Sequence, residues 1–110
     1  MTSTLHALAS RQCRPGAPLL SPDDLAPHLA VLPGWTHARK HIAKTFHFAD
    51  YYETVAFVNA IAFVAHRQDH HPDLAVRFDH VDVVYATHDA GGVTLNDCIC
   101  AAKVETLSSG

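Results

Sequence analysis

The spacing of hydrophobic positions changes several times along this chain, and each spacing predicts one element. Leucines recur at helical intervals between residues 21 and 32, and Ser21-Pro22 is a typical helix start. Alternation over residues 35–38 and 41–48 predicts two strands, with Lys44 as the exception on an otherwise apolar face. We therefore expect a helix followed by a strand pair.

The second half of the chain repeats this order. A broad apolar arc predicts a helix over residues 51–69, wide enough to pack on a sheet and on a partner subunit. Residues 74–78 and 81–86 alternate around Asp79-His80, which predicts a hairpin. Thr94-Leu95-Asn96-Asp97 has the form of a capping box before a last helix to about residue 106. The order α-β-β-α-β-β-α predicts an α+β fold, with helices on one face of a four-stranded antiparallel sheet.

The two ends of the chain lack such spacing. Residues 1–19 mix Ser, Thr, Pro and Gly without a sustained period, so we expect a flexible N-terminal leader there. Residues 20–107 are expected to form one domain and residues 108–110 a tail. A single domain also suits a length of 110 residues.

Composition narrows the functional classes. A formal net charge of −3 without a cluster of Lys or Arg argues against direct binding to nucleic acid. No apolar run approaches the length of a membrane span, so we expect no membrane association. The three cysteines form no CxxC pair, which favours buried or half-buried residues in a reducing compartment and a cytoplasmic location.

Histidines supply the candidate chemistry, and two of the ten are adjacent in Asp69-His70-His71-Pro72-Asp73. Pro72 disfavours helical geometry at His71, so the pair lies where the long helix ends. The following hairpin returns its second strand to the same level, which brings His88 of Thr87-His88 toward the pair. Imidazoles exchange protons near neutral pH, and neither a paired nucleophile nor a phosphate loop accompanies them. We therefore expect general acid–base chemistry on a small ligand.

Two alternatives concern neighbouring residues. Asp97 has a structural explanation, because it would cap the last helix, and this role competes with a role in the site.

His66 and His70 are four residues apart on the predicted helix, and His71 or His88 could add a third metal ligand. The sequence lacks the Glu of an HExxH motif, so the match to a metal site is incomplete. The remaining histidines are expected to be surface or satisfied core residues: His6, His28, His37, His41, His47 and His80.

Several runs resemble one known family, the pterin-4a-carbinolamine dehydratases. The resemblance is carried without gaps by His70-His71-Pro72-Asp73, Thr87-His88, Gly92-Val93-Thr94 and Asp97. Upstream runs are also similar to the family: Leu32-Pro33-Gly34-Trp35, Phe46-His47-Phe48 and Phe57-Val58-Asn59. The similarity covers about residues 20–105, and the family fold is the α+β order predicted above.

This resemblance implies dehydration of 4a-hydroxytetrahydrobiopterin (pterin-4a-carbinolamine) to quinonoid dihydropterin, which recycles the pterin of an aromatic amino-acid hydroxylase. The pterin is then the substrate, no metal or organic cofactor is implied, and a homodimer or homotetramer is expected. His70 and His88 would be acid–base groups, and His71 would bind and orient the pterin. Asp97 would support the site through His88 or a backbone amide. Further binding or supporting positions are His66, Pro72, Leu74 and Thr87.

Four positions depart from the family pattern. His66 replaces a frequent acidic residue, Leu74 an aromatic residue, Phe78 a tyrosine and Asn96 a basic residue. The three histidines of the motif are kept, so a dehydratase is the first hypothesis. The second is a non-catalytic binding or assembly protein on the same scaffold, since some animal relatives are dimerisation cofactors of a homeodomain transcription factor. The third is a metal protein that uses His66 and His70.

Overall fold

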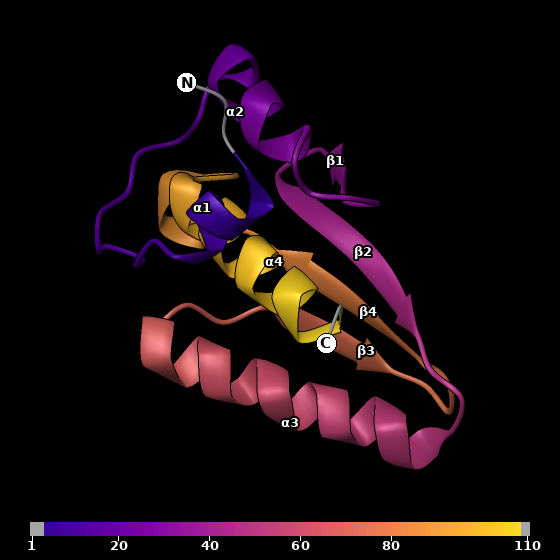
Figure 1. Ribbon diagram of the computed structural model, residues 1–110. Coiled ribbons are helices and arrows are strands. Elements are labelled where there is room, and N and C mark those ends of the chain that lie inside the picture. Colours follow the sequence, from indigo (N-terminus) through magenta and orange to yellow (C-terminus); the bar gives the residue numbers. More distant parts are fainter. Residues whose placement is uncertain (1–3, 109–110) are drawn as a thin grey trace.

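The computed structural model describes residues 4–108 and confirms the predicted α+β fold with its four-stranded antiparallel sheet (Figure 1). None of the helices in this described part is long and apolar enough to cross a membrane. The elements are, in order, α1 (Leu5–Ala9), α2 (Pro22–Leu29), β1 (Thr36–Ala38), β2 (His41–His47), α3 (Tyr51–Gln68), β3 (Asp73–Val76), β4 (His80–Tyr85), the short 3-10 helix η1 (His88–Ala90) and α4 (Leu95–Ser108).

The strand order of the sheet is β1-β2-β4-β3, and neighbouring strands are antiparallel. The register gathers apolar side chains on one face, as in the fully buried cross-strand pair Ile42 and Tyr85. Lys44, the predicted exception, also lies on this face, and its Nζ donates to Glu105 Oε1 at 2.8 Å. Its charge is therefore paired where the apolar face meets α4, while its stem packs beside the core.

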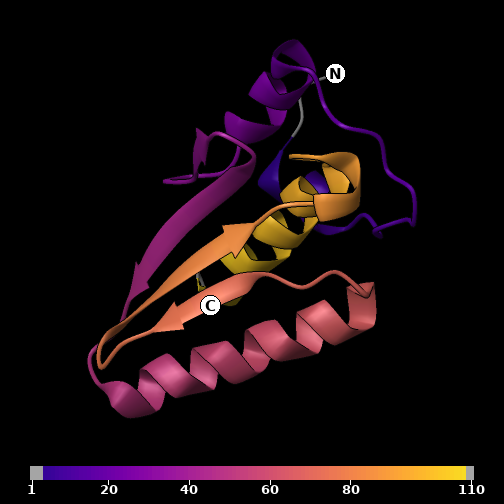
Figure 2. The ribbon, with the colours of Figure 1, turned by 180° about the vertical axis from the view of Figure 1, so that it is seen from behind.

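Helices α3 and α4 cover the apolar face of the sheet. α3 turns a helically spaced stripe inward, formed by Thr54, Phe57, Ile61 and Ala65. α4 is buried on nearly all sides, because the sheet, α1 and α3 all pack against it. Figure 2 shows the opposite side, where β4 passes in front of α4 and β2 lies beside β4. The helices thus lie on one face, as the sequence predicts.

The N-terminal segment differs from the prediction of a flexible leader. Thr4 caps α1 by accepting a hydrogen bond from the Ala7 amide at 3.0 Å, and Leu8 is only 3% exposed. Burial of such a leucine stabilises the packed state by about 1.5–3 kcal/mol, which holds α1 against α4. Lys103 adds a hydrogen bond from Nζ to the Ala9 carbonyl at 2.6 Å. Residues 1–3 of the predicted leader lie outside the described residues.

Two smaller predictions also need correction. The amide of Arg77 donates to the His80 carbonyl at 2.8 Å, so Phe78-Asp79 forms the hairpin tip rather than Asp79-His80. The difference is one residue, and β3 still pairs with β4 through Val76 and Val81. The last helix continues to Ser108, the first residue of the predicted tail, and residues 109–110 lie outside the described residues.

Candidate active site

The end of α3 sets the position of His70, the first histidine of the motif. Asp69 has left-handed backbone geometry, with φ 50°, and the His70 amide donates back to the Ala65 carbonyl at 3.2 Å. This is the hydrogen-bond pattern that ends many helices, although glycine is more usual at the left-handed position. The helix therefore ends before Pro72 is reached, and His70 no longer shares a helix face with His66. The predicted pairing of these two histidines on one helix face is thus wrong.

His70 turns toward the buried start of α4 and meets Asp97. Its Nε2 lies 2.6 Å from Asp97 Oδ1, and the carboxylate is fully buried. The imidazole also stacks on the ring of Tyr85, with centroids 5.9 Å apart and planes 9° from parallel. The buried carboxylate and the tyrosine together fix the position of the His70 ring.

The carboxylate of Asp97 has two tasks. Its Oδ2 accepts hydrogen bonds from the Thr94 amide at 2.9 Å and from the Thr87 hydroxyl at 2.8 Å. The first bond is the cap predicted from the sequence, while Oδ1 holds His70. Asp97 therefore both caps the last helix and takes part in the site, so the two alternatives are both correct. Of the two routes implied by the resemblance, the backbone amide is present, but the imidazole that Asp97 binds is His70 and not His88.

This pairing sets the charge and the tautomer of His70. The hydrogen bond to Asp97 raises the pKa of His70, against the opposing effect of burial. Because Asp97 accepts, Nε2 carries the shared proton, and no protein group within residues 4–108 hydrogen-bonds Nδ1. His70 can therefore donate a proton from Nδ1 when charged and accept one there when neutral.

The three histidines of the motif line one pocket. Its volume is about 280 Å³, and its walls are Asp69, His70, His71, Ala86, Thr87, His88 and Asp89. His71 and His88 are exposed, whereas the His70 side chain is only 13% exposed. Four other predicted positions do not line this pocket: Asp97 is buried behind His70, His66 is exposed on α3, and Pro72 and Leu74 are half-buried along the chain into β3.

A second cavity adjoins the first and has an N-terminal wall. It measures about 300 Å³ and shares His70, Thr87, Asp69 and Asp89 with the first pocket. Its other side is formed by residues 13–16, with Gln68 and Asn96. We call residues 12–16 the N-terminal strap. The sequence prediction missed this wall, because it assigned the whole segment to a flexible leader.

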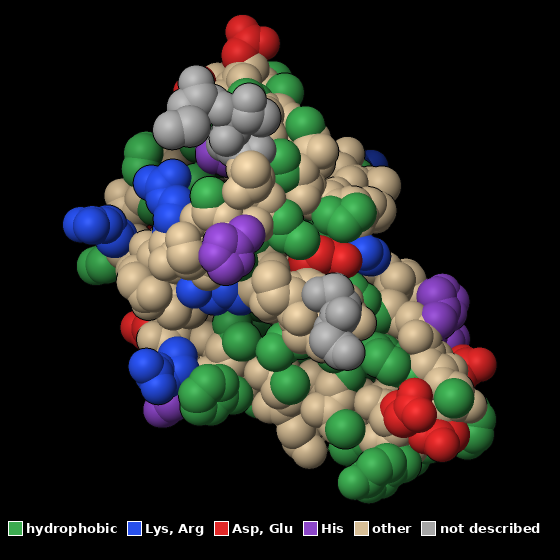
Figure 3. All heavy atoms as spheres, in the orientation of Figure 1, with side chains coloured by type: hydrophobic (Ala, Val, Ile, Leu, Met, Phe, Trp, Pro, Cys, Tyr) green, Lys and Arg blue, Asp and Glu red, His purple; other side chains and the backbone are tan. Residues whose placement is uncertain are grey.

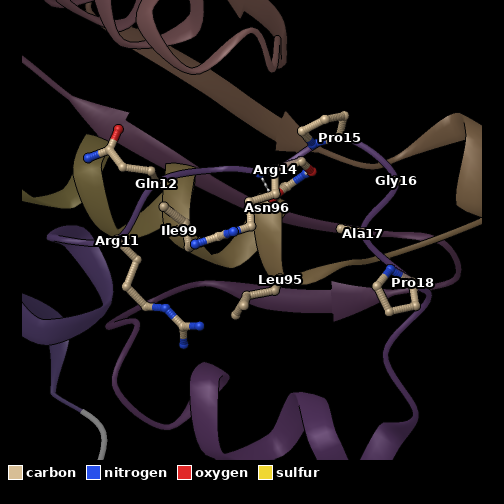
Figure 4. A pocket seen from close by; sticks show the side chains of 10 residues that line it. All are labelled: Arg11, Gln12, Arg14, Pro15, Gly16, Ala17, Pro18, Leu95, Asn96 and Ile99. Carbon is tan, nitrogen blue, oxygen red and sulfur yellow. Dashed lines mark hydrogen bonds between the residues drawn. The ribbon is translucent and has the colours of Figure 1, made fainter.

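Asn96 clamps the strap to the start of α4. Its Oδ1 accepts from the Arg14 amide at 3.0 Å, and its Nδ2 donates to the Arg14 carbonyl at 2.7 Å (Figure 4). Gln68 adds a second clamp, since its Oε1 accepts from the Cys13 amide at 2.8 Å. In the sequence, Asn96 is a departure from the family pattern. That departure was the one signal in the sequence that could have indicated the ordered strap. Figure 3 shows Lys and Arg side chains gathered on the side of the molecule where the strap passes.

Replacing Asn96 by alanine is expected to loosen the strap. The two lost hydrogen bonds are each worth about 0.5–1.5 kcal/mol, so strap opening should become roughly tenfold more frequent. Amide hydrogen exchange over residues 12–16 would measure this, with Asn59→Ala on the exposed side of α3 as the control. Unchanged exchange in Asn96→Ala would show that the clamp does not hold the strap.

Two further features lie outside this site. A larger cavity of about 460 Å³ lies against Arg11, Arg14, Leu95 and Ile99, and Figure 4 shows the strap curving around it. Among the described residues, no histidine lines this cavity, so its chemistry differs from that of the motif. Across residues 4–108, no three side chains of the types His, Cys, Asp and Glu are grouped to hold a metal ion.

A helix-covered antiparallel sheet that presents a carboxylate-bound histidine at an open pocket defines a class: small α+β proteins with a candidate acid–base site. Comparison of the sequence with known protein families identifies the family. A family model described as pterin 4 alpha carbinolamine dehydratase matches residues 18–107, and the chain belongs to this family. The resemblance noted in the sequence is thereby confirmed.

Relatives and solved structures support the assignment. A Nitrosospira multiformis protein named "Putative pterin-4-alpha-carbinolamine dehydratase" is 47% identical over 110 residues, which cover 97% of each chain. One of the same name from Xanthomonas campestris pv. campestris is 59% identical over 85 residues, or 76% of this chain and 72% of that one. The crystal structure of a transcriptional coactivator/pterin dehydratase from Brucella melitensis has a TM-score of 0.78 and 32% identity, and the match covers 81% of this chain and 97% of that one.

A more distant structure shares the fold alone. It is a pterin dehydratase-like protein identified as a RuBisCO assembly factor in the alpha-carboxysome, with a TM-score of 0.58 and 22% identity. The match covers 69% of this chain and 88% of that one. The scaffold therefore occurs in proteins with different described roles, and the site must carry the argument about function.

Proposed function

We propose that this protein dehydrates 4a-hydroxytetrahydrobiopterin to quinonoid dihydropterin in the cytoplasm, and so recycles the pterin of an aromatic amino-acid hydroxylase. The observation that carries the proposal is the buried His70–Asp97 pair at a pocket also lined by His71 and His88. Membership of the dehydratase family supports the same reaction.

The reaction needs one proton donor and one proton acceptor. The bond between C4a and the hydroxyl oxygen breaks, the hydroxyl takes up a proton and leaves as water, and a ring nitrogen loses a proton. In the proposal, charged His70 donates from Nδ1, because its raised pKa keeps more of it protonated near neutral pH. His88 accepts the proton from the ring nitrogen, and His71 orients the pterin. The proposed steps involve these side chains and no metal or organic cofactor.

The size of the site suits a small substrate. Two cavities of about 280 and 300 Å³ meet at His70 and Thr87. Their volumes are near the lower end of the range for small-molecule pockets. A flat bicyclic pterin could occupy the first cavity while its side chain extends toward the strap. The strap would then contribute to substrate binding, although it is distant in sequence from the histidine motif.

A direct dehydration assay tests the proposal. Freshly generated 4a-hydroxytetrahydrobiopterin would be followed by absorbance, and the decay with protein would be compared with the spontaneous decay. The expected result is a decay rate that rises in proportion to protein concentration. A folded protein that leaves the spontaneous rate unchanged would contradict the proposed activity.

The second candidate function is non-catalytic binding or assembly. The Brucella melitensis protein is described as a transcriptional coactivator/pterin dehydratase, which supports this second candidate function. The exposed aromatic side chains Tyr52 and Phe63 on α3 would serve such binding. Binding of a protein partner that is unaffected by His70→Ala would separate this function from the dehydratase.

The outer face of α3 is also the proposed contact between copies of this chain. Tyr52 is 83% exposed and Phe63 is 63% exposed, on a stripe that continues to His66. Phe63→Asp is expected to shift the protein from a homodimer or homotetramer to a monomer, because it introduces a charge into an apolar contact. Sedimentation velocity would measure the shift, with Thr36→Asp on β1 as the control. An oligomer that persists in Phe63→Asp would place the contact elsewhere.

A further inference from the structure

Two cysteines that are distant in sequence meet at the strap. Cys13 Sγ lies 3.4 Å from Cys100 Sγ, although 87 residues separate them. Cys13 belongs to the N-terminal strap and Cys100 to the buried helix α4. The contact therefore joins the wall of the candidate active site to the centre of the core.

The surroundings give the two thiols different properties. Cys13 is half-buried, and the hydrogen bond from Cys100 lowers the pKa of Cys13, with the nearby positive charges of His70 and Lys103 acting in the same direction. Cys100 is fully buried, and both this hydrogen bond and burial raise its pKa. Cys13 is thus the thiol that ionises more readily and is closer to solvent, which are the two properties of a reactive cysteine.

We propose that Cys13 and Cys100 are a peroxide-sensitive dithiol whose disulfide fastens the N-terminal strap to α4 beside the candidate active site. In the first step the Cys13 thiolate attacks a peroxide oxygen, the O–O bond breaks, and Cys13 becomes a sulfenic acid while hydroxide leaves and takes up a proton. In the second step the Cys100 sulfur attacks the Cys13 sulfur, the S–S bond forms, and the sulfenic oxygen leaves as water. With hydrogen peroxide, two thiols lose two electrons and the peroxide becomes two molecules of water.

The disulfide would act on the same wall that the clamps hold. In the reduced protein, hydrogen bonds from Asn96 and Gln68 hold the strap, and each of them can open independently of the fold. A disulfide at Cys13 would prevent the strap from opening there, because Cys13 is the strap residue that contacts both Asn96 and Gln68. Oxidation therefore fixes one wall of the pocket that contains His70. The effect on turnover rests on the proposed dehydratase function, whereas the formation of the disulfide does not.

The chemistry is tested on the full chain with hydrogen peroxide. After treatment, unfolding and thiol titration, the wild type should have lost two of its three thiols, and peptide mapping should find Cys13 joined to Cys100 in the same chain with a mass decrease of about two hydrogens. Cys98→Ala is the matched control, because Cys98 is buried on the same helix and burial raises its pKa to about 12. It should still form the disulfide, while Cys100→Ala should instead accumulate a trappable sulfenic acid at Cys13.

The proposal would be overturned by three intact thiols after treatment, by a disulfide between two chains, or by over-oxidation of Cys13 in the wild type without any bond to Cys100. Thiol loss in Cys98→Ala that differs from the wild type would also contradict it, since Cys98 has no part in the bond. Each of these results is read from mass and thiol content, so none depends on enzymatic activity.

The mechanical consequence is tested with Asn96→Ala, which lacks one clamp. Oxidation of this variant should slow amide exchange over residues 12–16 by roughly tenfold or more, because the disulfide replaces the lost hydrogen bonds. If the protein is a dehydratase whose strap contributes to substrate binding, we expect Asn96→Ala to raise KM, and oxidation should return that KM toward the wild-type value. Exchange that stays fast in the oxidised variant would overturn the fastening role. Slow exchange without any dehydratase activity would support the disulfide and refute only the proposed function.

Discussion

Replacing His70 by alanine is expected to lower kcat for dehydration by about 10²–10⁴-fold, to a rate near the spontaneous one. The reason is geometric, because His70 is the pocket histidine that a buried carboxylate holds in one orientation and one tautomer. Within residues 4–108, no carboxylate supports the exposed His71 or His88 in this way. Stopped-flow absorbance with freshly generated 4a-hydroxytetrahydrobiopterin would measure the loss.

The His70→Ala variant also leaves a buried carboxylate oxygen without its partner, at a cost of about 1–3 kcal/mol in the free energy of unfolding. His70→Gln provides the matched control, because its side-chain amide can donate to Asp97 but cannot transfer a proton. We expect His70→Gln to recover stability without recovering activity, and the exposed His37→Ala to retain both. Near-normal turnover in a folded His70→Gln would exclude His70 as the proton donor.

The local patterns in the sequence were sufficient for the fold and for the grouping of the three histidines. Alternation predicted the strands that carry Ile42 and Tyr85, which the structure pairs on one buried face. The predicted hairpin returns His88 to the level of His70, as the shared pocket shows. These predictions succeed because strand alternation and chain reversal depend on residues close in sequence. The capping position of Asp97 was predicted by the same local rule.

The strap could not be predicted in this way. The bonds that order it join Cys13 to Gln68 and Arg14 to Asn96, over separations of 55 and 82 residues. A segment of Pro, Gly and polar residues has no apolar period of its own, so its order depends entirely on these distant partners. The same holds for the second task of Asp97, since a carboxylate at a cap position gives no sign that a histidine 27 residues earlier will reach it.

Asp97→Asn is expected to have the largest combined effect on stability and on the pH dependence of turnover. Asp97 accepts from His70, Thr87 and the Thr94 amide, and an asparagine amide would direct N–H groups at one or more of these donors. Each donor left unpaired in this buried place costs about 1–3 kcal/mol, so the loss should be clear in chemical denaturation. The exposed Asp89 at the pocket rim offers a comparison, and Asp89→Asn should cost far less.

The pH dependence has a definite sign. Asp97 raises the pKa of His70 above its ordinary value of 6.5, so the pairing stabilises the wild type fully below about pH 6.5 and the contribution is lost as pH rises through the higher folded pKa. The stability gap between wild type and Asp97→Asn should therefore be wider at about pH 6 than at about pH 9. If charged His70 is the proton donor, the alkaline limb of the kcat/KM profile should also move to lower pH in Asp97→Asn. A limb that stays in place would show that His70 does not act as the acid, even if the variant proves less stable.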